Sequence, residues 1–298
     1  MSFSNKISVV VPTYNSMLLL NSTLRSFLDQ TVDKSCFEII VVDDGSKDGT
    51  RFLVDEYRDQ LDISYYYLED KGFRLAAARN VGLHFAKYSL VLFFDCGMLA
   101  SNELLESHLR KHEVSSNCVL IGMSYGVEEF SMVNARELDK ILNGHTLADA
   151  FSILRSTSQF NDCRYDAMEK LDFDLSPTRC PWVVCWGGHM SCGTSDLRRI
   201  GGFDEYFNSW GGEDVELAIR LHRAGCTFEV LNSLEAIHAP HFKEEEENIN
   251  SSRKNIQYII KKHPQPEVEL LGRFGWEDIF ARQDAKVELS DSMIMAST

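Results

Sequence analysis

The first hundred residues alternate between short apolar runs and segments with helical spacing. The apolar runs are rich in β-branched and aromatic residues, which is typical of buried strands, and the segments between them place apolar side chains on one helical face. The expected strands are Ile7–Val11, Phe37–Val42, Ile63–Leu68 and Leu90–Phe94. The expected helices cover Leu20–Leu28, Thr50–Asp59 and Leu75–Lys87. This alternation predicts an α/β fold with a mostly parallel central sheet and helices on both faces.

Polar residues follow these strands at their carboxyl ends, where open α/β sheets bind ligands. Pro12 and Tyr14 follow the first run, Asp44 follows the second, and Asp95 follows the fourth. Tyr14 can stack on a base while Asp44 accepts a hydrogen bond from an imide N–H. By itself, a DDGS segment is more typical of a polar turn that caps the next helix, so this interpretation stays open beside the binding one. Neither GxGxxG nor GxxxxGK[ST] occurs, so the sequence does not indicate a dinucleotide fold or a P-loop.

The charge balance limits the class of partner. The 298 residues include 45 acidic and 30 basic side chains, and the formal net charge is −15. Because this field repels polyanions, we expect no nucleic-acid partner. No apolar stretch reaches the roughly 20 residues that span a bilayer, and the first residues lack the pattern of a signal peptide. These features predict a cytoplasmic protein without a membrane span.

Several motifs together resemble a known enzyme family. SVVVPTYN, EIIVVDDGSKDGT, RLAAARNVGL and LVLFFDCGM, in this order and spacing, are similar to the donor half of family 2 glycosyltransferases, which have the GT-A fold. The segment GGHMSCGTSDLRRIGGFDEYFNSWGGEDVELAIRLHRAGC, residues 187–226, resembles the acceptor half of β-1,4-galactosyltransferases and of bacterial chondroitin-type polymerases. The resemblance implies an enzyme that moves a hexose or N-acetylhexosamine from a nucleotide sugar to an acceptor hydroxyl. The expected nucleotide is UDP.

The resemblance also implies roles for residues of the donor site. Pro12, Tyr14 and Asp44 would line the pocket for uracil and ribose. Asp70 and Arg79 would lie near the base and the diphosphate. The donor itself would be a UDP-sugar.

The segment DCG corresponds to the DxD motif of the family, whose last acid ligates Mn²⁺ or Mg²⁺ beside the donor diphosphate. Asp95 would be its first acid, and His238 in EAIHAP matches a late metal-binding histidine. Gly97 occupies the place of the last acid and has no oxygen ligand to offer to a hard cation. Either Asp95 and His238 hold a weaker metal site, or the cationic side chains of Arg74 and Arg79 neutralise the leaving group. A third interpretation is that the glycine is an ordinary turn residue that the site tolerates.

The WGGED segment provides candidates for the chemistry. Transfer with inversion needs a carboxylate that removes the proton of the acceptor hydroxyl, and a positioned general base contributes about 10²–10⁴-fold. Asp214 suits this role, with Glu213 bound to the acceptor and Trp210 against a sugar ring. The alternative is helix capping, because acids favour the N-terminus of a helix such as the one expected at Val215–Ala224. Polypeptide N-acetylgalactosaminyltransferases resemble the same segment yet retain configuration, so stereochemistry stays open.

The motifs suggest how the chain is organised. We expect one GT-A catalytic domain over residues 1–240, with a nucleotide-sugar half at 1–99 and an acceptor half at 100–240. Residues 241–298 would form a C-terminal extension and tail, in which Gly272–Phe280 docks as a short helix.

Two other functions remain in view. A sugar nucleotidyltransferase would need a glycine-rich basic loop after the first strand, and PTYNS has neither property. A non-catalytic relative that binds a nucleotide or sugar is motivated by Gly97. The acceptor of a transferase is equally open between a glycan, a peptide and a small molecule.

Three histidines outside these motifs invite a metal interpretation. His108 and His112 are one helical turn apart, but no third zinc ligand accompanies them, so we expect them on a solvated helix face. His189 is either a buried, hydrogen-bonded side chain or part of a GGH segment whose backbone N–H groups approach the donor sugar.

Overall fold

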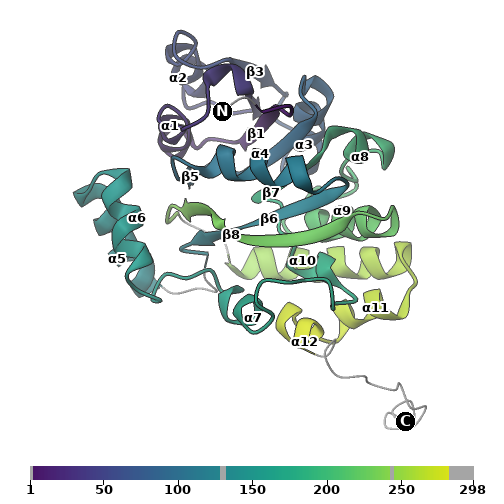
Figure 1. Ribbon diagram of the computed structural model, residues 1–298. Coiled ribbons are helices and arrows are strands. Elements are labelled where there is room, and N and C mark those ends of the chain that lie inside the picture. The colour runs from purple at the N-terminus through teal and green to yellow at the C-terminus, as the bar shows by residue number, and fades with distance from the viewer. Residues whose placement is uncertain (1–2, 128–131, 242–244, 282–298) are drawn as a thin grey trace.

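One mixed sheet organises the computed structural model, which describes residues 3–127, 132–241 and 245–281 (Figure 1). Its strands are β1 (Ile7–Thr13), β2 (Phe37–Asp43), β3 (Ile63–Tyr67), β4 (Leu90–Phe94), β5 (Met98–Ala100), β6 (Cys118–Tyr125), β7 (His189–Gly193) and β8 (Thr227–His238). The α-helices are α1 (Met17–Ser26), α2 (Thr50–Glu56), α3 (Leu75–Phe85), α4 (Leu104–Val114), α5 (Met132–Gly144), α6 (Leu147–Arg155), α7 (Tyr165–Glu169), α8 (Thr194–Arg199), α9 (Glu213–Arg223), α10 (Glu245–Lys262), α11 (Pro266–Glu269) and α12 (Trp276–Ala281). Short 3₁₀ turns are η1 (Lys34–Cys36), η2 (Pro181–Val184) and η3 (Leu270–Gly272).

The strand order divides the sheet into a donor-side part and a second part. The order is β3-β2-β1-β4-β7-β6-β8-β5. Strands β3, β2, β1 and β4 are parallel, β7 runs antiparallel to both of its neighbours, β6 and β8 are parallel, and β5 is antiparallel to β8. The predicted α/β fold with a mostly parallel sheet is therefore confirmed, and β7 is the junction at which the two parts meet.

Helices cover both faces of this sheet, as the continuous apolar strands predict. Successive side chains of a strand point to opposite faces, so Val9 and Val11 of β1 pack with α1, α2 and α4, whereas Val10 packs with α3. Helices α9, α10 and α12 add buried side chains to the α3 face. In Figure 1 the yellow helices α10 to α12 lie together below β8.

The expected helix boundaries are close to the observed ones. The helix expected at Thr50–Asp59 ends earlier, at Glu56, and the segment expected to dock near the end of the chain forms α12. Ile279 and Phe280 of α12 are buried, which explains why this short helix docks. Residues 282–298 lie outside the described part of the chain.

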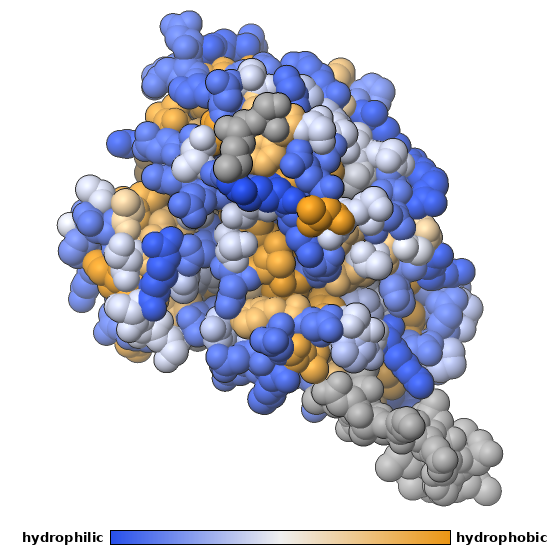
Figure 2. Space-filling view, viewed as in Figure 1, coloured by the Kyte–Doolittle hydropathy of each residue, from blue (hydrophilic) through white to orange (hydrophobic). Residues whose placement is uncertain are grey.

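The outer surface is mostly polar. Figure 2 shows hydrophilic side chains over most of one face, with hydrophobic ones in smaller patches between them. Within the described residues, every helix is too short or too polar to cross a bilayer.

Candidate active site

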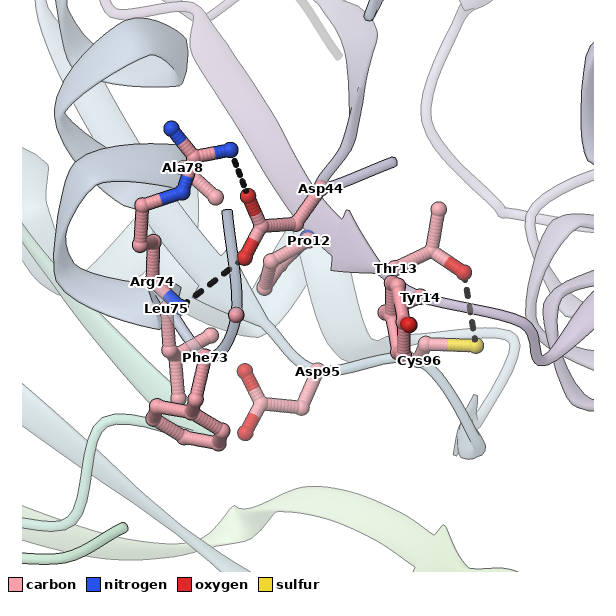
Figure 3. A pocket seen from close by; sticks show the side chains of 11 residues that line it. Pro12, Thr13, Tyr14, Asp44, Phe73, Arg74, Leu75, Ala78, Asp95 and Cys96 are labelled. Carbon is pink, nitrogen blue, oxygen red and sulfur yellow. Dashed lines mark hydrogen bonds and ion pairs between the residues drawn. The ribbon is translucent and has the colours of Figure 1, made fainter. Parts of the chain in front are cut away.

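A pocket of about 410 Å³ opens at the carboxyl ends of β1, β2 and β4 (Figure 3). Three predicted donor residues line it: Pro12 near the end of β1, Tyr14 directly after β1 and Asp44 directly after β2. Asp95 enters from the end of β4, and Figure 3 shows its carboxylate pointing into the space beside Phe73. The structure thus brings together residues that are more than eighty positions apart in the sequence, because parallel strands end at one edge of the sheet.

Asp44 is held on the pocket wall by Arg74. One carboxylate oxygen accepts from the guanidinium Nη2 at 2.7 Å and the other accepts from the backbone N–H of the same arginine at 2.9 Å. Burial raises the pKa of Asp44, and the positive charge of Arg74 offsets part of this effect. Arg74 also donates to the backbone carbonyl of Glu69. The pocket wall therefore holds Arg74 in a fixed position beside Asp44, the acid expected to bind the base.

Two exposed aromatic rings belong to this pocket. The predicted residue Tyr14 is 49% exposed, and its hydroxyl lies 3.3 Å from Asp70 Oδ2. Phe73, 42% exposed, was not predicted. Its only signal in the sequence is an apolar side chain in the otherwise polar turn EDKGFR. Asp70 lies at the rim, where its carboxylate also pairs with Lys47 at 3.4 Å.

Arg79 joins the donor side to the acceptor side. It projects from α3 and is 1% exposed. Its Nη2 lies 2.9 Å and 3.1 Å from the two carboxylate oxygens of Asp95, and its Nη1 lies 2.9 Å from Glu213 Oε1. Burial acts to lower the pKa of Arg79, but these two carboxylates raise it above its ordinary value. The guanidinium is therefore a permanent cation between the two acids.

The two acids of WGGED begin helix α9 and face different partners. Asp214 accepts from the backbone N–H of Gly187 at 2.9 Å and, through its other oxygen, from Val215 at 2.7 Å. Glu213 has one oxygen on Arg79, and its Oε2 is buried without a hydrogen-bond partner within the described residues. Burial raises the pKa of Glu213 to about 7, and the neighbouring carboxylate of Asp214 acts in the same direction. Asp214 therefore bonds both the first turn of its own helix, through Val215, and Gly187 in the segment that leads into β7, while the N-cap of α9 is a glycine and no side chain of the described residues caps the helix.

Trp210 lies in the same turn and is 47% exposed. Its backbone carbonyl is bound by α10, so the ring projects from a turn that is fixed through its main chain. The predicted acceptor-side residues Trp210, Glu213 and Asp214 thus belong to one turn and the helix start that follows it.

The residues present do not fit the divalent-cation site of a DxD motif. Asp95 is engaged by Arg79 through both oxygens, and Gly97 adopts φ +94°, a conformation that side chains larger than hydrogen rarely adopt. His238 lies opposite Met98 in the β5–β8 ladder, next to this turn, and its ring stands against His241. Among the described residues, no group of three or more His, Cys, Asp and Glu side chains is arranged to hold a metal ion.

The expectation for His108 and His112 is wrong. Both are buried, and both bond to the hydroxyl of Ser191 at 2.8 Å. His108 also lies 3.2 Å from His189, which in turn bonds Ser124. Burial lowers the pKa values of all three histidines, to about 4 for His112 and about 3 for His189. They form a neutral hydrogen-bonded cluster between α4 and the strands β6 and β7, because α4 turns its histidine-bearing face toward the sheet.

Two family models match the sequence of this chain. The family model described as glycosyl transferase family 2 matches residues 8–163. The chain belongs to glycosyl transferase family 2. A second model, described as the N-terminal domain of galactosyltransferase, matches residues 170–245 of this family 2 glycosyltransferase. The resemblance predicted for each half is confirmed.

Curated relatives match most of the chain. A validoxylamine A glucosyltransferase of Streptomyces hygroscopicus subsp. jinggangensis is 38% identical over 265 residues, which are 89% of this chain and 62% of that protein. The chondroitin synthase of Pasteurella multocida is 32% identical over 271 residues, 88% of this chain and 28% of the synthase. The chain thus spans less than two thirds of the length of these relatives.

Solved structures share the fold. Staphylococcus aureus TarS 1-349 in complex with UDP-GlcNAc has a TM-score of 0.62 at 20% identity, covering 93% of this chain and 72% of that one. The mannosyltransferase PcManGT from Pyrobaculum calidifontis, in complex with GDP-Man and Mn²⁺, has a TM-score of 0.59 at 18% identity and covers 96% and 71%. The GT-A fold expected for this chain is confirmed.

Proposed function

We propose that this family 2 glycosyltransferase moves a hexose or N-acetylhexosamine from a UDP-sugar to an acceptor hydroxyl. One observation carries the proposal: Asp95 of the donor pocket and Asp214 of the acceptor side both bind the dipeptide Gly187-Gly188. The backbone N–H of Asp95 donates to the carbonyl of Gly188 at 3.0 Å, and the N–H of Gly187 donates to Asp214 at 2.9 Å. A donor in the pocket would therefore have its sugar within reach of a fixed carboxylate.

The reaction follows from this placement as a single displacement with inversion. The acceptor oxygen attacks the anomeric carbon, the bond from that carbon to the diphosphate oxygen breaks, and Asp214 takes the hydroxyl proton. Each oxygen of Asp214 accepts one backbone N–H, which fixes the plane of the carboxylate and leaves lone pairs for the proton. Glu213, whose free Oε2 is buried beside the base, would bind the acceptor, and Trp210 would cover one face of a sugar ring.

In this proposal the donor half binds the nucleotide. Tyr14 and Phe73 would contact the uracil, Asp44 would accept from its N3–H, and Pro12 would complete the pocket wall. Asp70 would orient the Tyr14 hydroxyl at the rim.

Charge on the leaving diphosphate is the point at which this chain departs from its family. Arg74 lies on the pocket wall with 24% of its side chain exposed, and it can pair with phosphate oxygens. A divalent cation held by Asp95 and His238 is the competing proposal, and it would require Asp95 to leave Arg79. We expect turnover to persist in a chelator and to fall in the Arg74→Ala variant. Complete loss of wild-type turnover in chelator, restored by Mn²⁺, would contradict this expectation.

The relatives suggest which substrates to try first. UDP-glucose, UDP-GlcNAc and UDP-GalNAc form a donor panel, tested with validoxylamine A as the first acceptor and with glycan and peptide acceptors after it. Calorimetry measures donor binding, and mass spectrometry with UDP release measures transfer.

The outcomes separate the candidate functions. Product with one donor, absent in Asp214→Asn, supports the transferase. Tight UDP binding without transfer or hydrolysis for any donor supports a non-catalytic relative. Release of pyrophosphate from a nucleoside triphosphate and a sugar phosphate would support a nucleotidyltransferase.

A further inference from the structure

The glycines of WGGED adopt a backbone conformation that residues with larger side chains rarely adopt. Gly211 and Gly212 have φ values of +94° and +95°, both in the region that favours glycine. A Cβ on Gly211 would lie 3.2 Å from Ser252 Cβ, and one on Gly212 would lie 3.1 Å from Ile259 Cδ1. Two consecutive glycines thus let the turn press closely against helix α10.

Asn255 of α10 binds the carbonyls that this conformation exposes. Its Nδ2 lies 2.7 Å from the carbonyl oxygen of Gly211 and 3.3 Å from those of Ser209 and Trp210. The side chain is 5% exposed. The two N–H donors of this amide are shared among three carbonyls, with the shortest contact to Gly211, so the amide favours this single arrangement of the turn.

Further contacts tie α10 and the residue after it to the same turn and to α9. Ser251 Oγ donates to the carbonyl of Trp210 at 2.8 Å. Two residues beyond the base, the wholly buried Glu216 of α9 accepts from Lys262 at 2.7 Å and from His263 at 2.9 Å. Helix α10 therefore holds α9 both before and after Asp214.

We propose that Asn255 is a positioning residue for the base: by fixing the turn 209–212 it sets where α9 presents Asp214. The proposal rests on the proposed transferase function and extends it to a helix outside both matched halves. Displacement of a catalytic group by about 1 Å can cost about 10²-fold in rate. The substitution Asn255→Ala removes the amide. Asn255→Asp keeps the size of the side chain but replaces the N–H donors by an oxygen that repels the three carbonyls.

The primary experiment measures UDP release from UDP-glucose with validoxylamine A, together with UDP binding. We expect kcat to fall about 10- to 100-fold in both variants, with UDP affinity unchanged and the acid limb of the pH profile displaced. Ser251→Ala, which removes one bond to the turn, should cost about two- to tenfold. Asn250→Ala is the matched control, since Asn250 is exposed on the same helix, and it should behave as the wild type.

A second experiment does not depend on the substrate. Hydrogen exchange of the peptide covering 208–216 should accelerate in Asn255→Ala and not in Asn250→Ala, while UDP binding shows that each variant is folded. Unchanged exchange in this peptide overturns the inference. So does a full wild-type kcat in a folded Asn255→Ala protein when Asp214→Asn is inactive. If Asp214→Asn is itself active, the proposed function fails instead.

Discussion

Two arginine–carboxylate arrangements flank this active site, and they differ in their access to water. On the donor side, Arg74 and Asp44 have 24% and 10% of their side chains exposed and line an open pocket. On the acceptor side, Arg79 and Glu213 have only 2% and 7% exposed, with Asp95 completing the ion pairs. An open pair can exchange its partner for a ligand, whereas a buried pair is costly to break because an uncompensated charge remains. The difference indicates that the Arg74–Asp44 pair can open to a ligand, whereas Arg79 holds Asp95 and Glu213 in a fixed arrangement.

The largest effect should come from the buried side. Asp214→Asn keeps the size of the side chain but cannot take a proton, so transfer should fall by about 10²–10⁴-fold while UDP affinity is retained. Steady-state kinetics measures the transfer rate, and calorimetry measures the UDP affinity. Asp278→Asn, which changes an exposed first-turn acid of α12, is the control for a capping effect. Retained turnover in Asp214→Asn would show that Asp214 is not the general base.

Breaking each arginine pair compares the two sides directly. Arg79→Met leaves Glu213 buried and unpaired, and the free energy of unfolding should fall by about 3–5 kcal/mol. Arg74→Met should cost about 1 kcal/mol or less, because Asp44 keeps a backbone N–H and contact with water. Urea unfolding of both variants measures the difference. Equal losses would show that burial does not distinguish the pairs.

The binding role of the donor side has its own test. If Asp44 accepts from uracil, Asp44→Ala should weaken UDP binding by about 1.5–3 kcal/mol, the range for a hydrogen bond to a charged group. Calorimetry with UDP gives the value, and the exposed Asp59→Ala serves as control. If Asp44→Ala binds UDP with wild-type affinity, Asp44 does not bind the uracil and the DDGS segment is only a polar turn.

A further effect concerns pH and stability. The pKa of Glu213 is raised from 4.5 to about 7 in the folded protein, so its protonated form is favoured by folding. This contribution to stability is present in full below about pH 4.5 and is lost as the pH rises through about 7. Glu213→Gln should therefore flatten the fall in unfolding free energy between these pH values. A profile that is identical to the wild type would show that Glu213 is ionised throughout.

Parts of the site follow from local patterns and parts do not. Asp44 and Asp95 were predicted because acids follow apolar strands, and Glu213 and Asp214 because they belong to a recognisable segment. Phe73 was missed, since one aromatic residue in a polar turn has no periodic signal. The prediction for His108 and His112 failed for a related reason: spacing showed that they share a helix face, but not that this face packs against β7.

The sequence by itself determined the strand and helix alternation, the family and the acids of the site, because these depend on local hydrophobic period and short motifs. Only the tertiary structure decided what each acid faces. Arg79 lies between Asp95 and Glu213, and Asn255 reaches the turn before Asp214, across separations of 134 residues for the Arg79–Glu213 pair and 44 for Asn255–Gly211. No local pattern encodes such contacts, because they arise only when α3 and α10 both meet the start of α9.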